Sequence, residues 1–337
     1  MPGTRHYTVW ESTSKGVQVF RKEFGQRHRM KTLIVKLGAT GDVVRTTPLL
    51  RQLKGEVVWV TASRNKPLLE GLAGLPVSLE VINWEDRSNV AGRSFDLLIQ
   101  LEDDPQTAAI QKSVIATRIF GAYEADGGVM SYTRDSSRWF ELSLISEFGR
   151  EKADELKLRN RSTYQELIFE GLGFHFAGEE YFLPSSVESK LTGDVAIAPE
   201  AGAVWPMKKW AHFGWLKSEL ESRGLKVNYL PTRETLLEHL ADVRGHRCVV
   251  SGDSLPMHLA LGSRIPSVAL FNCTSPWEIH DYGILTKLVS PLLDEFFYKR
   301  GFDARATTAI TQDEVLFAVL QSVEAGTTGA RERVLPA

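Results

Sequence analysis

Short apolar runs alternate with longer helical stretches along most of this sequence, and this alternation is what most constrains its fold. Eight runs have the length and composition of buried strands: residues 33–35, 57–60, 77–82 and 97–99 in the first half, and residues 195–198, 227–229, 248–250 and 267–270 in the second. Stretches with helical character lie between or after them, among them 67–72 and 107–120. Strands that alternate with helices form parallel sheets covered on both faces. The sequence therefore predicts an α/β protein.

The two groups of strands predict two similar domains, which a chain of 337 residues is long enough to form. Residues 123–185 interrupt the alternation and are richer in charge and aromatic side chains. We expect one domain over residues 30–185 and a second over residues 186–337. Residues 1–29 precede the first strand as a basic extension, since residues 1–36 hold eight Lys or Arg against two Glu. Such a segment is suited to an anionic surface, and the alternative is a solvated chain end.

Composition excludes several classes of protein. The chain has 40 basic and 42 acidic side chains, a net charge of −2, which argues against a dedicated nucleic-acid binder. No apolar run approaches the ~20 residues that span a bilayer, and no secretory signal is readable. Two cysteines, Cys248 and Cys273, are too few for a disulfide framework or a cysteine-rich metal site. These features predict a cytoplasmic protein.

The first candidate for chemistry is the glycine-bearing turn at residues 36–42, which follows a strand and precedes a helix. It lacks the G-x-G-x-x-G spacing of dinucleotide-binding proteins. Gly38 and Gly41 would let the backbone approach a ligand, and Asp42 follows a strand whose carboxyl end faces the crevice of an α/β sheet. Asp42 is a candidate general base, and the alternative is that it caps the helix.

Two further candidates follow strands of the second half. Residues 199–210 combine tiny residues, two tryptophans and the adjacent lysines Lys208 and Lys209, a set that could hold a phosphate or could be a solvated loop. Residues 251–262 predict a helix whose N-terminus follows a strand and offers an anion site. His258 falls on the first turn of that helix, where it either contacts the same ligand or is a satisfied core histidine.

Metal binding is not predicted. Glu102, Asp103 and Asp104 are adjacent at the end of a strand, and we interpret them as a solvated turn. His239 and His246 are seven residues apart without further ligands at metal-binding spacing. The sequence indicates no metal site and no cofactor.

Taken together, these motifs resemble glycosyltransferase family 9, the bacterial lipopolysaccharide heptosyltransferases. The segments that match are, in order, GDVVRTTPLL at 41–50, the W-P-x-K-x-W stretch at 205–210, a segment like D-[ST]-G-x-x-H-L-A at 253–260 and the P-x-x-x-L-F strand at 266–271. The resemblance runs from residue 30 to about 322. It implies the GT-B fold, in which two Rossmann-like domains face a central cleft, the second holding the sugar nucleotide and the first the acceptor. It also implies that the last helix, at about 310–322, packs back on the first domain.

The resemblance also implies roles for individual residues. It assigns the catalytic base to Asp42, a phosphate-binding lysine to Lys208 and the diphosphate loop to Asp253, Ser254 and Leu255. Leu255 departs from the family, which usually has glycine there; leucine resists positive φ and adds bulk beside the phosphates. The local shape of the loop is therefore in question.

Further donor-binding residues are Glu234, aligned with an acidic residue that binds ribose hydroxyls, and His258. The family's acceptors are anionic, so we expect arginines on the acceptor side. The candidates are Arg45, Arg64, Arg134 and Arg138.

The implied activity is inverting, metal-independent transfer of a sugar, heptose from ADP-heptose, to a lipopolysaccharide core or related glycan. The implied partners are a nucleotide-sugar donor and a lipid-linked oligosaccharide, with peripheral contact at the cytoplasmic face of the inner membrane. The alternatives are another nucleotide sugar or acceptor, and a catalytically silent protein that binds sugar nucleotides. An oxidoreductase is disfavoured by the missing glycine fingerprint.

Overall fold

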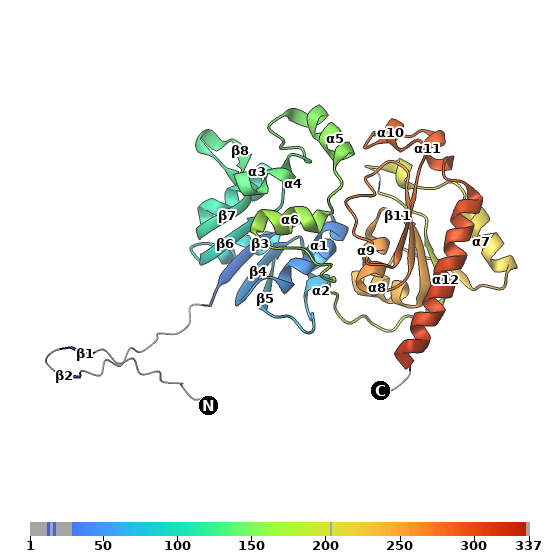
Figure 1. The fold of residues 1–337 in the computed structure, drawn as a ribbon, viewed down its shortest axis with the longest axis horizontal. Coiled ribbons are helices and arrows are strands. Elements are labelled where there is room, and N and C mark those ends of the chain that lie inside the picture. The colour runs from blue at the N-terminus through green and yellow to red at the C-terminus, as the bar shows by residue number, and fades with distance from the viewer. Residues whose placement is uncertain (1–11, 14–15, 18–28, 203, 335–337) are drawn as a thin grey trace.

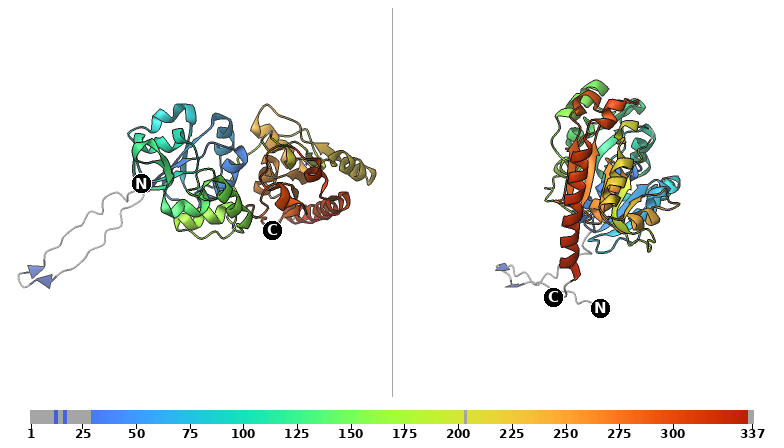
Figure 2. Two further views of the ribbon diagram at one scale, coloured as in Figure 1. Left: turned by 90° about the horizontal axis from the view of Figure 1, so that it is seen from above. Right: turned by 90° about the vertical axis from the view of Figure 1, so that its right-hand side faces the viewer.

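The computed structural model describes residues 12–13, 16–17, 29–202 and 204–334, with side chains described over 29–202 and 204–325. The expected basic extension, residues 1–29, lies outside the described residues apart from residue 29 and a two-stranded pair, β1 (Ser12–Thr13) and β2 (Gly16–Val17). The rest forms two lobes side by side, each with its own sheet (Figures 1 and 2). The predicted α/β class with two Rossmann-like domains is confirmed.

The first domain is built on a six-stranded sheet of order β5-β4-β3-β6-β7-β8, parallel except for β8. Its strands are β3 (Lys31–Val35), β4 (Glu56–Thr61), β5 (Ser78–Asn83), β6 (Ser94–Gln100), β7 (Ile115–Glu124) and β8 (Met130–Tyr132). Its helices are α1 (Thr40–Thr46), α2 (Lys66–Leu69), α3 (Pro105–Ala108), α4 (Ser137–Phe140), α5 (Gly149–Arg159) and α6 (Tyr164–Leu172).

The second domain has a five-stranded parallel sheet of order β10-β9-β11-β12-β13. Its strands are β9 (Gly193–Ala198), β10 (Val227–Tyr229), β11 (His246–Gly252), β12 (Ser267–Phe271) and β13 (Leu285–Val289). Its helices are α7 (Phe213–Ser222), α8 (Leu236–Arg244), α9 (Leu255–Gly262), α10 (Leu293–Phe296), α11 (Ala304–Thr308) and α12 (Gln312–Val334). All eight expected strands are therefore present.

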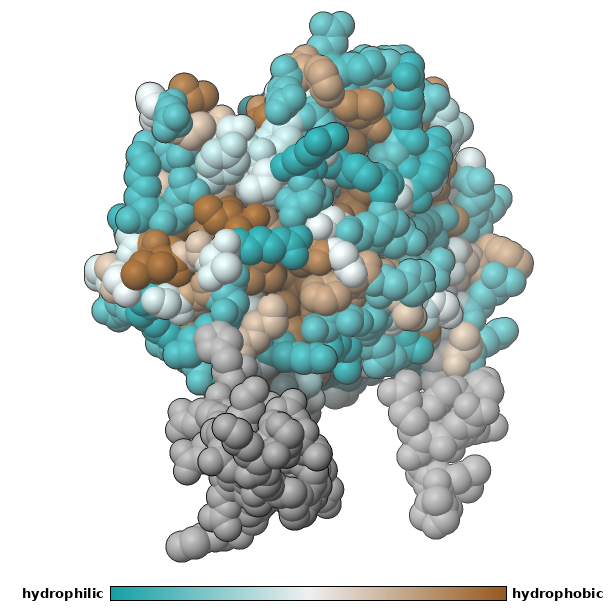
Figure 3. Space-filling model, turned by 60° about the vertical axis from the view of Figure 1, so that its left-hand side comes forward, coloured by the Kyte–Doolittle hydropathy of each residue, from teal (hydrophilic) through white to brown (hydrophobic). Residues whose placement is uncertain are grey.

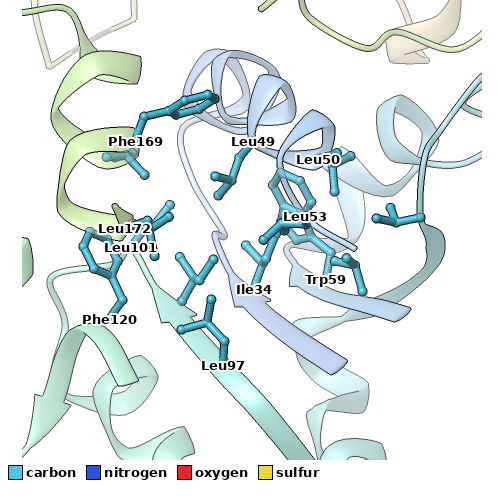
Figure 4. Packing of buried hydrophobic residues seen from close by; sticks show 14 of the residues in the cluster. Ile34, Leu49, Leu50, Leu53, Trp59, Leu97, Leu101, Phe120, Phe169 and Leu172 are labelled. Carbon is cyan, nitrogen blue, oxygen red and sulfur yellow. The ribbon is translucent and has the colours of Figure 1, made fainter. Parts of the chain in front are cut away.

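The core of the first domain shows why its strands read as uninterrupted apolar runs. Ile34 and Leu97, from the central strands, face Leu49 and Leu50 beyond α1 and Phe169 from α6, and all five are buried (Figure 4). A second cluster covers the opposite face of the same sheet. Because helices or loops cover both faces, side chains on both sides of each central strand must be apolar.

Two expectations about the elements were wrong. Residues 107–120 are not one helix: α3 and a 3₁₀ turn (Ala109–Ser113) give way to β7. The last helix does not return to the first domain through its described side chains. Instead, Val315, Val319 and Val323 of α12 are buried against Val250 and Val268 of the second sheet, which occupies the apolar stripe of the helix.

The two domains meet where α1 approaches α9. Val44 of α1 lies in one apolar cluster with Met257 of α9 and with Tyr181 of the segment that joins the domains. The approach is close at Gly41, where an added Cβ would lie 2.8 Å from Cδ2 of His258. The helix that carries Asp42 is thereby packed against the helix that follows Asp253.

On the face shown in Figure 3, hydrophilic residues predominate and hydrophobic ones form separate groups. Among the described helices, none is both long and apolar enough to cross a membrane.

Candidate active site

A cleft of about 620 Å³ lies between the two domains. Its first-domain wall is formed by the turn at the start of α1, by residues 142–144 and by α5. Its second-domain wall is formed by the turn before Lys208, the start of α9 and the turn that follows β12. Because β3, β11 and β12 are strands of parallel sheets, their carboxyl ends deliver these loops to one edge of each sheet.

Asp42 lies in the first turn of α1 and lines the cleft. Its Oδ1 pairs with Arg45 Nη2 at 2.8 Å, and its Oδ2 accepts a hydrogen bond from Ala39 N at 3.3 Å. A third of the side chain is exposed. Burial opposes ionisation, but Arg45 and then Lys36 hold the pKa of Asp42 below its ordinary value. The carboxylate therefore contributes to the helix start and also faces the cleft in its ionised form.

The turn before Asp42 is held by Glu102. Its Oε1 accepts from Lys36 Nζ at 2.8 Å, Leu37 N at 2.6 Å and Gly38 N at 3.1 Å. The interpretation of 102–104 as a solvated turn was therefore wrong for Glu102, which is an anchor of the loop. Asp103 lines the cleft. Asp104 caps α3.

Lys208 faces the cleft at the end of a 3₁₀ turn (Pro206–Lys208). Its Nζ donates to the backbone oxygen and to Oδ2 of Asp253, both at 2.9 Å. Burial raises the pKa of Asp253, but Lys208 and His258 outweigh burial and hold it well below its usual range. The backbone at Gly252 makes this approach possible, because an added Cβ would lie 2.6 Å from the oxygen of Lys208. The lysine and aspartate thus form a preformed pair at the cleft wall.

The start of α9 completes this wall. Ser254 is the N-cap and Leu255 the first helical residue, and both line the cleft. Leu255 is not among the described non-glycine residues with positive φ. The leucine therefore follows ordinary helical geometry, so this loop does not need glycine for its backbone shape. The N-terminus of an eight-residue helix faces the cleft here, next to Lys208.

His258 lies one turn into α9 and is 4% exposed. Its Nδ1 lies 3.3 Å from the Tyr181 hydroxyl. Burial, together with the charge of Arg45, lowers the pKa of His258 to about 4, so the imidazole is neutral near pH 7. His258 both lines the cleft and packs against Gly41, which unites the two interpretations that the sequence left open.

Eight of the eleven sequence-predicted site residues line the cleft: Asp42, Arg45, Arg64, Lys208, Asp253, Ser254, Leu255 and His258. The structure does not bring the other three there. Glu234 is exposed on the loop before α8, and it does not line the described cleft. Arg134 lines a separate hollow beside β7 and β8. Arg138 is exposed and pairs with Glu170 of α6, because α4 turns it away from the cleft.

Sequence reasoning missed several residues of the cleft. Arg150 and Lys157 reach it from α5, whose charged sequence has no pattern that marks one face as functional. Trp205, Tyr298 and Glu278 reach it from loops of the second domain. Lys157 joins them, since its Nζ lies 4.2 Å from the centre of the Tyr298 ring and 3.9 Å from Glu278 Oε1. Of these residues, Trp205 was the one that the sequence could have indicated, because it belongs to the W-P-x-K-x-W stretch.

Among the described residues, no group of three or more His, Cys, Asp or Glu side chains is arranged to hold a metal ion. Two acidic groups of the cleft, Asp42 and Asp253, are instead paired with Arg45 and Lys208. An anionic ligand in the cleft would therefore contact these cations and the start of α9.

The sequence matches no protein-family model and no curated protein. Solved structures do match. The glycosyl transferase family 9 structure from Veillonella parvula is 16% identical, with a TM-score of 0.59, and the match covers 88% of this chain and 97% of that one. Escherichia coli heptosyltransferase WaaC, solved with ADP-2-deoxy-2-fluoro heptose, is 15% identical, with a TM-score of 0.54 and coverage of 88% and 99%. E. coli ADP-heptose lps heptosyltransferase II is 14% identical, with a TM-score of 0.53 and coverage of 88% and 99%.

These matches define the class of the fold: two Rossmann-like domains around a cleft, the GT-B arrangement. More narrowly, the chain has the fold of family 9 glycosyltransferase structures over most of its length. The resemblance expected from the motifs is confirmed at the level of fold.

Proposed function

We propose that this chain is a glycosyltransferase that moves a sugar from a nucleotide-sugar donor to a hydroxyl group of an acceptor. One observation carries the proposal. An ionised carboxylate, Asp42, lies on one wall of the cleft, and a cationic site, Lys208 beside the start of α9, lies on the other. Glycosyl transfer needs both, on opposite sides of the reacting carbon.

The second-domain wall would hold the diphosphate. Lys208 would exchange part of its contact with Asp253 for a phosphate oxygen, and the start of α9 would add N–H groups and the positive end of the helix dipole. These interactions strengthen as negative charge develops on the leaving group, so they stabilise the transition state without a metal ion. Glu234 remains a candidate for the ribose hydroxyls, outside the cleft itself.

The chemical step is a single displacement. Asp42 takes the proton of the acceptor hydroxyl, whose oxygen forms a bond to the anomeric carbon. The bond from that carbon to the diphosphate oxygen breaks, and its electron pair leaves with the nucleoside diphosphate. Attack opposite the leaving group inverts the configuration. Closure of the cleft would exclude water, which otherwise hydrolyses the donor.

Within this class we propose ADP-heptose as donor and a lipopolysaccharide core or related glycan as acceptor. Two of the similar structures support this choice, since one contains an ADP-heptose analogue and another is an ADP-heptose heptosyltransferase. Cations on the first-domain wall, Arg64, Arg150 and Lys157, suit an anionic acceptor. If that acceptor is lipid-linked, the protein would work at the cytoplasmic face of the inner membrane.

A thermal-shift panel tests the proposal. ADP, UDP, GDP and dTDP and their sugar conjugates are added in the presence of EDTA, because a ligand that binds the folded state raises Tm. We expect ADP and ADP-heptose to give the largest increase. Donor turnover measured with and without acceptor then separates an enzyme from a silent binding protein. Binding that requires Mg²⁺ or Mn²⁺, or no binding by any member, would contradict the proposal.

A further inference from the structure

The turn after β12 places two polar side chains on the cleft wall that lack hydrogen-bond partners. Ser275 is 2% exposed and Glu278 is 8% exposed, and both line the cleft. Ser275 Oγ and Glu278 Oε1 are buried, and neither makes a hydrogen bond within the described structure. Lys157 Nζ lies 3.9 Å from Glu278 Oε1, close enough for an ion pair but beyond hydrogen-bond distance.

Such atoms are costly to leave unsatisfied, because a buried donor or acceptor has lost its hydrogen bonds to water. Buried polar groups are therefore usually paired, and unpaired ones at a cleft wall point to a ligand or a water molecule as the partner. Glu278 is also held in place. Its backbone oxygen accepts a hydrogen bond from Tyr164 N at 3.0 Å, and the neighbouring Trp277 ring packs 3.7 Å from the Arg161 guanidinium.

The position of the pair identifies which part of a ligand it would meet. Glu278 lines the 620 Å³ cleft beside Lys208 and Asp253, and it also lines the adjoining hollow beside Asp42 and Arg45. It therefore lines the cleft near both the proposed diphosphate site and the proposed base. When a nucleotide sugar is bound for transfer, its sugar lies between the diphosphate and the catalytic base that deprotonates the acceptor.

We propose that Ser275 and Glu278 form a subsite for hydroxyl groups of the transferred sugar, with Glu278 as the residue that determines specificity. This inference rests on the proposed function. A carboxylate accepts hydrogen bonds from neighbouring hydroxyls, and a serine hydroxyl either donates or accepts, so the pair suits a polyhydroxylated ring. It adds nothing to the binding of the nucleotide, and its effect is confined to the sugar.

The test compares a nucleoside diphosphate with its sugar conjugate by calorimetry, using ADP and ADP-heptose, or the UDP, GDP or dTDP pair if the panel selects it. In the wild type, the Kd of the diphosphate divided by the Kd of its sugar conjugate gives the contribution of the sugar to binding. We expect Glu278→Gln to lower this ratio about tenfold and Ser275→Ala about threefold, with the Kd of the free diphosphate unchanged. Glu295→Gln is the matched control, because Glu295 lies on α10 in an exposed ion pair with Arg305.

The outcomes separate the two proposals. If the wild type binds neither member of any pair, the proposed function and the subsite both fail. If it binds a pair and the ratio is unchanged in both variants, the subsite alone fails. If the variants weaken the diphosphate and its sugar conjugate equally, Glu278 only supports the domain contact at Tyr164 and the subsite is again excluded. Urea midpoints of all variants report whether folding is affected, and Ser275→Ala, the smaller change, keeps the test open if Glu278→Gln unfolds.

Discussion

Asp42 Oδ1 lies 2.8 Å from Arg45 Nη2, almost one turn further along α1, and the Arg45 guanidinium lies 4.0 Å from the centre of the Tyr164 ring. Tyr164 and Asp42 together hold the Arg45 side chain in place, and Arg45 in turn holds the carboxylate in the first turn of α1. A base held in this way is ionised at neutral pH but is also stabilised by its partner. The ion pair with Arg45 therefore lowers the basicity of the Asp42 carboxylate and also fixes its orientation.

Asp42→Asn should lower kcat by roughly 10²–10⁴ and leave donor affinity nearly unchanged, because the amide keeps a hydrogen-bond acceptor for Ala39 N but cannot take a proton. Turnover and donor Kd are measured on the same protein. Asp313→Asn is the control, since Asp313 is exposed in the first turn of α12. Near-normal turnover in Asp42→Asn would remove this residue from the role of base.

Lys208→Ala should weaken nucleoside diphosphate binding at least tenfold and also destabilise the fold by about 1–3 kcal/mol, because buried Asp253 loses its ionic partner. The adjacent lysine offers a matched control. Lys209 is more exposed and pairs with Glu200, so Lys209→Ala should change neither property by much. Calorimetry and urea denaturation measure the two effects. Equal behaviour of the two variants would show that the motif is a solvated loop.

Gly41→Ala should destabilise the protein by roughly 1–3 kcal/mol, because the new methyl group would lie 2.8 Å from His258 Cδ2 and force α1 away from α9. Gly202→Ala is the control, as an added Cβ there meets no atom within 4 Å. The measurement is the urea midpoint of each variant. An unchanged midpoint in Gly41→Ala would mean that the domains separate without cost at this contact.

Uninterrupted apolar runs are clearest in the strands whose two faces are both covered, although the partly buried edge strands β5 and β10 were also predicted. β3 and β12 are buried almost throughout and are therefore uninterrupted apolar runs. β13 lies at a sheet edge and is buried only at Leu285, and β7 exposes much of its first half, so neither has such a run. Their absence from the predicted set has this physical cause.

The site residues that could be predicted from the sequence are those that directly follow a strand of a parallel sheet. Asp42 and Asp253 each follow a strand of a parallel sheet, so their convergence on one cleft follows from topology. Lys157 and Glu278 reach the cleft through the packing of α5 and a loop across the domain contact, and such packing has no periodic signature in the sequence. Arg138 lies outside the cleft because α4 packs against α6, where the arginine pairs with Glu170, and no sequence pattern indicated this contact.

His258 should make stability fall with decreasing pH between about 6.5 and 4. Its pKa is about 4 in the folded protein, against an ordinary value near 6.5, so within this range the unfolded chain binds a proton that the folded protein does not. Stability is then lost as pH falls, by roughly 3 kcal/mol at most, and the loss from this group ends near pH 4. Burial also lowers the pKa of His239, His246 and His280, so the wild-type curve contains all four.

The contribution of His258 to the pH dependence of stability is obtained by comparing the wild type with a variant that lacks this imidazole. His258→Asn keeps a polar partner for the Tyr181 hydroxyl but does not titrate, so its stability should depend less on pH over this range. Urea denaturation at pH 7, 6 and 5 measures the slope, with His175→Asn as a control at an exposed position. Parallel curves for wild type and His258→Asn would show that this imidazole is not buried in its neutral form.

Removal of the first-domain cations should raise the KM for an anionic acceptor without changing donor affinity. Arg64 and Arg150 line the cleft, whereas Arg138 pairs with Glu170 outside it. We therefore expect Arg64→Gln with Arg150→Gln to raise KM roughly five- to tenfold for a phosphorylated core oligosaccharide, and Arg138→Gln to have little effect. Higher salt should reproduce the increase, because exposed charges are screened over about 10 Å at 0.1 M ionic strength. A dephosphorylated acceptor should be insensitive to both changes. If instead KM for the phosphorylated acceptor follows Arg138 and not the cleft arginines, the acceptor enters along α4 and α6, not through the cleft mouth.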